Sequence, residues 1–414
     1  MTEAGEVGPG PKAARSTASP AAAHAAVAAA FREEAGHLTA SLVRSLGDFD
    51  LAEESVQEAV VQALEHWPRE GIPTRPAAWL LTVARRRALN RLSRDARYAA
   101  KLAELVREPP PEPDDRLQLI FTCCHPALRR EWQVALTLRA VFGFTTGEIA
   151  RAFVASEEAV AQRIVRAKRK IASAGIPYRM PGPEELPDRL SEVLAVLYLL
   201  LNEGHLATSG SGWRRDLSED ALWLTGLLCR LLPGEPEALG LLALMRLHLA
   251  RADARFTETG DLVRLADQDR SLWDHEAIRE ALALIERAAA MRRPGPYQVE
   301  AAIAACHAEA PSFESTDWMQ VVALYDLLLE MEPSPVVRLN RALVVWRVAG
   351  AEAALRELDG LAGDLDGYHI YHAARGELLS VMGRDEQARA ARLQAHDLTH
   401  NQAERALLRQ RLLL

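Results

Sequence analysis

Residues 145–171 read TTGEIARAFVASEEAVAQRIVRAKRKI, and this stretch decides the class of fold. Thr145 and Glu148 have the spacing of a capping box, the pattern that opens a helix. Ser156 is a predicted N-cap for a second helix, because two glutamates follow it in the favourable first turn. Two capped helices separated by a short turn predict a helix-turn-helix.

The second predicted helix has an apolar stripe and a polar stripe. The apolar stripe, expected to be buried, is Val160, Ile164, Ala167 and Ile171. The opposite side carries glutamine and arginine, which can read base edges and grip phosphates. The predicted DNA contacts are Ser156, Glu158, Gln162, Arg163, Arg166 and Arg169. A merely solvated basic helix is the alternative, but the capped pair of helices favours DNA binding.

Two helices of opposite charge are predicted upstream of this motif. Residues 48–67 combine an apolar stripe with an acidic face, which repels DNA and suits a basic or mixed-charge protein partner. Residues 79–101 carry seven basic side chains against one acidic side chain, and such a stripe suits a phosphate backbone. Trp79 could stack on a base or fill the core, and the core is favoured for a single tryptophan.

The rest of the chain is helical in pattern and acidic. Apolar residues recur at spacings of three and four with no alternating strand, so we predict an all-α fold. Residues 1–170 hold 24 basic and 21 acidic side chains, whereas residues 171–414 hold 25 and 36. Because a nucleic-acid-binding surface is a local patch, this difference in charge predicts that residues 1–170 face DNA and that residues 171–414 form an acidic part away from it.

Other functional classes are disfavoured by what the sequence offers. Cys123 and Cys124 are adjacent, with no second cluster, so we predict packed side chains and no metal site. We find no nucleophile–base arrangement and no phosphate-cradling loop, so we predict neither an enzyme nor a bound cofactor. The start of the chain lacks a signal pattern and no apolar run could span a bilayer, so we expect a soluble cytoplasmic protein without membrane contact.

Proline-rich segments divide the chain into predicted domains. The loop between the acidic and basic helices is expected at Pro68–Pro76, and Gly350 and Gly383 stand 33 residues apart, close to the period of tetratricopeptide (TPR) helical hairpins. The predicted parts are a disordered tail (1–20), a helical domain (21–101), a linker (102–114), the helix-turn-helix domain (115–175), a second linker (176–186) and a helical extension (187–414).

Several stretches resemble a known family. Residues 49–59 (FDLAEESVQEA) and 76–88 (PAAWLLTVARRRA) resemble region 2 of extracytoplasmic-function (ECF) RNA polymerase sigma factors. Residues 144–151 (FTTGEIAR) with 165–170 (VRAKRK) resemble region 4 of these proteins. Other segments, including 114–127 (DDRLQLIFTCCHPA) and 197–204 (LYLLLNEG), resemble the ECF subgroup with a long TPR-like C-terminal extension.

The resemblance implies a role for each region. The chain would bind core RNA polymerase, at the β′ clamp helices and the β flap, and promoter DNA. The residues expected to contact the polymerase are Asp48, Asp50, Glu53, Glu54 and Gln57. Those expected at the −10 element are Trp79, Arg86, Arg87, Asn90, Arg91 and Arg94, while the second helix of the helix-turn-helix would read the −35 element. The extension would regulate activity in place of a separate anti-sigma factor, with a small YCII-like protein as a partner.

Two other classes of protein remain as alternatives. A one-component regulator, with a TPR-like sensor attached to a helix-turn-helix, would bind duplex DNA without polymerase. A scaffold with no DNA role would tolerate replacement of Arg166 and Arg169. The acidic helix followed by a tryptophan-led basic helix disfavours both, since neither class needs that pair.

Overall fold

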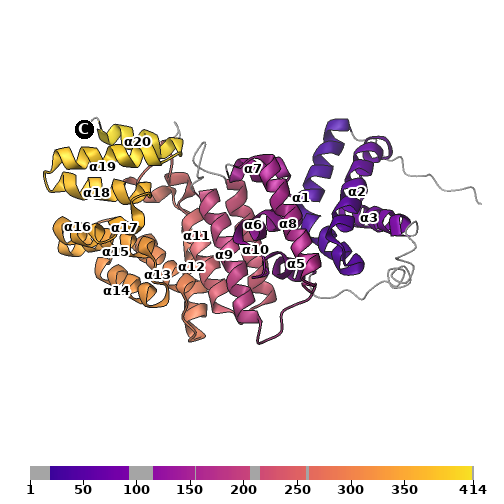
Figure 1. The fold of residues 1–414 in the computed structure, drawn as a ribbon, viewed down its shortest axis with the longest axis horizontal. Coiled ribbons are helices and arrows are strands. Elements are labelled where there is room, and N and C mark those ends of the chain that lie inside the picture. Colours follow the sequence, from indigo (N-terminus) through magenta and orange to yellow (C-terminus); the bar gives the residue numbers. More distant parts are fainter. Residues whose placement is uncertain (1–18, 93–114, 154, 206–214, 258–260, 413–414) are drawn as a thin grey trace, which may run out of the picture. The chain divides into compact units, whose positions relative to one another are not determined.

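The computed structural model describes residues 19–92, 115–153, 155–205, 215–257 and 261–412 (Figure 1). The chain divides into two compact units, which are Met1–Ile149 with Glu157–Arg189, and Ala150–Ser156 with Leu190–Leu414. Within the described ranges the only extended pairing is a single antiparallel bridge between Phe256 and Leu262. The all-α prediction is therefore confirmed.

Three helices form the N-terminal part of unit 1, namely α1 (Pro20–Leu46), α2 (Phe49–Glu70) and α3 (Pro76–Leu92). Helix α1 ends at Gly47, whose φ of 65° is a left-handed conformation that glycine adopts without strain. Asp48 then caps α2 by accepting the N–H groups of Asp50 and Leu51 at 2.9 and 3.0 Å. One glycine and one aspartate thus set the sharp turn between α1 and α2.

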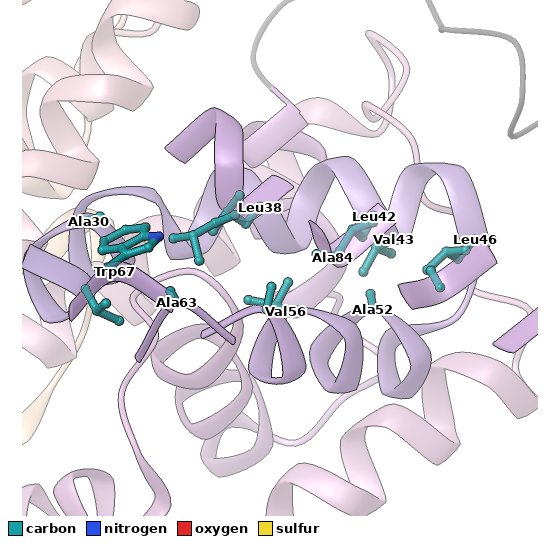
Figure 2. Packing of buried hydrophobic residues seen from close by; sticks show 14 of the residues in the cluster. Ala30, Leu38, Leu42, Val43, Leu46, Ala52, Val56, Ala63, Trp67 and Ala84 are labelled. Carbon is teal, nitrogen blue, oxygen red and sulfur yellow. The ribbon is translucent and has the colours of Figure 1, made fainter. Parts of the chain in front are cut away.

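A core of small and branched side chains holds these helices together. Figure 2 shows Ala52, Val56 and Ala63 on α2 facing α1, where Leu38 and Leu42 lie. Alanines on α2 let the two backbones approach closely, because they occupy little space between the helices. The buried leucines of α1 fill the remaining volume.

The prediction of a loop over Pro68–Pro76 was wrong at its beginning. Pro68 lies inside α2, which continues to Glu70, so the loop covers only residues 71–75. Proline costs one backbone hydrogen bond within a helix. Here Trp67 is 1% exposed and anchors the last turn in the core, and the N–H of Gly71 donates to the Trp67 carbonyl. Burial of a large aromatic side chain outweighs the missing bond.

The next helices in the described residues are α5 (Asp115–Cys123), α6 (Arg130–Ala140), α7 (Thr146–Ala152) and α8 (Glu157–Ser173). Cys123 and Cys124 are fully buried, as predicted for packed side chains. Burial also raises the pKa of the Cys123 thiol.

The described part of the extension is a series of helices. Its helices are α9 (Leu186–His205), α10 (Arg215–Leu231), α11 (Pro236–Leu249), α12 (His275–Ala290), α13 (Pro296–Glu309), α14 (Trp318–Met331), α15 (Pro335–Ala349), α16 (Ala351–Asp359), α17 (Ala362–Leu365), α18 (His369–Val381), α19 (Asp385–Leu398) and α20 (Gln402–Leu412). Helices α15 and α16 pack as one hairpin, and α18 and α19 as another. Gly350 and Gly383, with φ of 86° and 69°, lie near the ends of α15 and α18.

Candidate nucleic-acid and polymerase interface

Helix α8 has a buried apolar side and an exposed polar side. The buried residues of α8 are Val160, Ile164, Ala167 and Ile171, the stripe expected from the sequence. Among the predicted DNA contacts, Arg163 is half-buried and the others are exposed, namely Ser156, Glu158, Gln162, Arg166 and Arg169. The structure therefore presents the side-chain donors of Gln162, Arg166 and Arg169 to solvent together, beside the acceptor Glu158, in an arrangement that fits a major groove.

A reciprocal cap fixes the helix that precedes α8. The Thr145 N–H donates to the Glu148 carboxylate at 2.7 Å, and the Glu148 N–H donates to the Thr145 hydroxyl at 3.2 Å. These bonds satisfy two backbone donors that a helix start would otherwise leave open. The predicted capping box is confirmed.

The acidic face of α2 is engaged by basic side chains in unit 1. Glu53 pairs with both Arg139 of α6 and Lys168 of α8, the latter at 2.5 Å. Lys168 also reaches Asp50 at 2.8 Å. We call the four residues Asp50, Glu53, Arg139 and Lys168 the α2–α8 cluster.

The α2–α8 cluster is only partly accessible to water. The side chains of Lys168, Arg139 and Glu53 are 12%, 19% and 24% exposed. Burial alone would raise the pKa of Glu53, but Lys168 and Arg139 overcome this and hold it below its ordinary value. Burial alone would lower the pKa of Lys168, but Glu53 and Asp50 hold it above its ordinary value. Glu53 and Lys168 are therefore charged at neutral pH.

A second, more exposed set of ion pairs joins α2 to α3. Arg91 donates to Glu54 at 2.9 Å and to Glu58 at 3.2 Å, and Arg87 lies 3.7 Å from Glu58. The side chains in this set are 43–52% exposed, so each pair contributes little to stability. Two arginines predicted at the −10 element thus rest on two glutamates in the structure.

The other residues predicted to contact the polymerase or the −10 element differ in burial and in hydrogen bonding. Arg86 and Asn90 are exposed on α3, and Gln57 donates to Glu53 at 3.2 Å on α2. Trp79 packs edge-to-face on Trp67 with ring centroids 5.6 Å apart, which supports the core alternative for Trp79. The predicted contact Arg94 and the linker over 102–114 lie outside the described residues.

Sequence reasoning missed Arg139 and the role of Lys168. A weak signal was present, because Lys168 directly follows the buried Ala167 along the chain. A cation at the edge of a buried stripe lies close to whatever that stripe packs against.

Comparison with known proteins decides the family. Residues 30–98 match sigma-70 region 2, and residues 118–171 match sigma-70 region 4. The uncharacterized protein R00370 of Rhizobium meliloti (strain 1021) is 44% identical over 387 residues, which cover 90% of this chain and 92% of that protein. The chain belongs to the sigma-70 family. In sigma-70 terms, α2 and α3 lie in region 2, and α6 and α8 in region 4.

The third match lies in the extension. Residues 189–289 match a family described only as one of unknown function. The sigma-70 regions are those of a transcription factor. Among the residues that the structure describes, no helix is both long and apolar enough to cross a bilayer, and no group of three potential metal ligands converges.

Proposed function

We propose that this sigma-70 protein is an ECF-type sigma factor that binds core RNA polymerase and starts transcription at promoters with −10 and −35 elements. In this proposal α8 reads the −35 element. Residues 71–75 and α3 engage the −10 element, and α2 binds the clamp helices of the polymerase. Binding the polymerase would place the protein in the cytoplasm.

The division of α8 into a buried apolar stripe and an exposed donor row is the observation that carries the proposal. Gln162, Arg166 and Arg169 are exposed together, while Ile164 and Ala167 are buried. A DNA-reading helix needs arginine and glutamine along one side, whereas a solvated basic helix does not. The order of region 2 before region 4 adds the second contact that a promoter needs.

In vitro transcription with purified core polymerase tests the proposal. The full chain is mixed with core polymerase and genomic fragments, and start sites are mapped. We expect discrete start sites with a shared pair of upstream elements, which weaken when Arg166 and Arg169 are both replaced by alanine. Failure of the chain to co-elute with core polymerase, together with tight binding to duplex DNA alone, would favour a one-component regulator instead.

We also propose that the extension regulates this activity. The TPR-like character of the extension is supported by the hairpins α15–α16 and α18–α19, in which Ala342, Ala354, Ala374 and Ala388 are buried. Removing residues 190–414 leaves the whole of unit 1, so promoter output with and without them gives the sign of the regulation. Equal output would refute a regulatory role. A small YCII-like protein as partner stays a prediction from the resemblance.

A further inference from the structure

Two arginines of unit 2 lie against one buried tryptophan. The guanidinium carbon of Arg270 is 4.3 Å from the centre of the Trp273 ring, and that of Arg251, just after α11, is 5.9 Å from it. Trp273 is only 4% exposed. Arg270 also donates to the carbonyl oxygens of His307 and Ala310 at 2.6 and 2.8 Å. These bonds attach the segment before α12 to the end of α13.

A third arginine continues this arrangement from α15. The centre of the His307 ring lies 5.4 Å from that of Trp318, which in turn lies 4.9 Å from that of Phe313. The guanidinium carbon of Arg347 is 4.8 Å from the centre of the Phe313 ring and 5.8 Å from that of Trp318. We give the name arginine–aromatic cluster to the residues Arg251, Arg270, Trp273, His307, Phe313, Trp318 and Arg347.

The three arginines of the arginine–aromatic cluster lack a balancing acidic side chain. Within the described ranges none of them forms an ion pair, whereas Arg341, also on α15, pairs with two carboxylates. Burial, together with the charges of Arg255 and Arg270, lowers the pKa of Arg251 to about 10, so Arg251 is still charged at neutral pH. Like charges that are close together and partly buried are destabilising, and a bound anion removes that cost.

Several buried polar atoms at the cluster have no hydrogen-bond partner among the described residues. They are Nη2 of Arg270, Nε1 of Trp273 and Oγ1 of Thr316, a residue of the loop that carries Phe313 and leads to Trp318. Trp273 and Thr316 are each 4% exposed. Guanidinium and indole nitrogens can only donate, and a buried donor without an acceptor is costly. These donors therefore suit an acceptor, and beside three arginines an anionic acceptor is the most favourable.

A carboxylate of the chain itself already acts on this cluster. Burial lowers the pKa of both Arg270 and Arg347, and the charge of Glu314 opposes that shift at both. Glu314 is exposed in the loop between α13 and α14, and within the described residues it forms no ion pair with either arginine. An anion placed closer to the two guanidinium groups gains more from the same attraction, because Coulomb energy grows as the distance falls. A carboxylate is therefore a favourable ligand group for these arginines.

The surroundings of the cluster favour an organic anion over an inorganic one. Arg347 is exposed and Arg270 is half-buried, so a ligand approaches both from solvent. Directly beside members of the cluster along the chain stand Leu272, Met319 and Val348, whose side chains are 53%, 64% and 43% exposed. Apolar groups next to a few charged donors suit a ligand that has an apolar body and a charged head.

We propose that the arginine–aromatic cluster binds the carboxylate group of an organic acid, which pairs with Arg270 and Arg347 while the apolar part of the ligand lies on the exposed side chains beside them. A free small acid and an acidic side chain of a partner segment present the same group, and the test below separates these two sources. The inference is independent of promoter recognition, because its test needs only the purified full chain.

Isothermal titration calorimetry on the full chain measures binding of three probes, which are octanoate, a capped peptide of alternating glutamate and leucine, and inorganic phosphate. We expect at least one of the two carboxylate probes to bind about tenfold more tightly than phosphate. Tighter binding of octanoate identifies a free acid as the ligand, and tighter binding of the peptide identifies a partner segment. Bound ligand should also slow amide exchange in residues 265–273 and 311–318, which hydrogen-exchange mass spectrometry locates.

Substitutions at exposed positions connect the binding to the cluster. Arg347→Gln should weaken carboxylate binding about tenfold or more, because it removes one of the two cations that hold the ligand. The matched control is Arg338→Gln, an exposed position about two and a half turns earlier on α15 and therefore on its opposite side, which should leave the affinity unchanged. Glu314→Gln removes a competing carboxylate and should tighten binding about two- to fivefold, a gain that a purely structural role of the cluster does not predict.

Absence of binding by both carboxylate probes would overturn the inference, as would equal affinities of the Arg347→Gln and Arg338→Gln variants. Tighter binding of phosphate than of either carboxylate would overturn the assignment to an organic acid. Circular dichroism reports whether each variant is folded. If Arg347→Gln impairs folding, Arg347→Lys takes its place, since lysine keeps the charge but loses the planar fork and should still bind the ligand more weakly than arginine does.

Discussion

Replacing Glu53 by glutamine tests how much one half-buried carboxylate contributes to unit 1. Glu53 is 24% exposed and carries two cations, Arg139 and Lys168. Glutamine keeps the shape and one acceptor but removes the charge. Removing one partner of a fully buried pair costs about 3–5 kcal/mol, and a hydrogen bond to a charged group contributes about 1.5–3 kcal/mol.

We expect the free-energy cost of Glu53→Gln to fall in the lower range, that of a hydrogen bond to a charged group, because each cation keeps another partner. Lys168 keeps Asp50, and Arg139 keeps its hydrogen bond to the Phe144 carbonyl at 3.1 Å. We therefore expect Glu53→Gln to destabilise the contact by about 1.5–3 kcal/mol, and slow amide exchange in α8 to accelerate by about 10- to 150-fold. Hydrogen-exchange mass spectrometry of the full chain, read on peptides from α2 and α8, measures this.

The neighbouring substitution Glu54→Gln is the matched control. Glu54 is 52% exposed and, within the described residues, forms one ion pair, with Arg91, which also holds Glu58. A pair so exposed contributes about 0.2–1 kcal/mol, so exchange in α8 should change by less than about fivefold. Equal effects of the two substitutions would refute the reasoning that burial and dual pairing set the contribution of Glu53.

The sign of the pH dependence follows from the same cluster. The folded pKa of Glu53 is lowered, so its contribution is complete above the ordinary carboxyl pKa and is lost as the pH falls through the folded pKa. Protection of α8 should therefore be constant near neutral pH and decrease only in acid. In the Glu53→Gln variant, the protection of α8 should therefore decrease less as the pH falls.

Three further predictions concern other parts of the chain. Thr145→Ala removes one half of the capping box and should destabilise α7 by about 1 kcal/mol, measured as faster amide exchange in residues 145–153 with α12 peptides unchanged. Arg166→Ala, if the side chain grips a phosphate, should lower the salt slope of promoter binding by holoenzyme by about 1, and an unaltered slope would exclude a phosphate contact there. Gly240→Ala places a Cβ atom 2.7 Å from the backbone nitrogen of Gln298, so it should destabilise the α11–α13 packing by about 1–3 kcal/mol and lower the melting temperature of the extension. The control Gly234→Ala adds a Cβ atom with nothing within 4 Å and should change that melting temperature by no more than about 1 °C.

Local patterns predicted local structure well in the helix-turn-helix. The spacing of Val160, Ile164, Ala167 and Ile171 identified the buried side of α8, and Thr145 with Glu148 identified the start of α7. Both signals depend on residues three or four positions apart, which a helix brings onto one face whatever surrounds it. The prediction that the helix ends before Pro68 was wrong, because the tendency of proline to end a helix takes no account of the burial of the neighbouring Trp67 side chain.

By itself, then, the sequence determined the helical class, the order of the two sigma regions and the side of α8 that faces solvent. Tertiary structure alone decided which charged groups meet. Lys168 and Asp50 are 118 residues apart, and Arg139 and Glu53 are 86 apart, so no periodicity links them. Such pairs arise where separately folded helices pack, and packing depends on the shapes of several helices at once rather than on spacing along one.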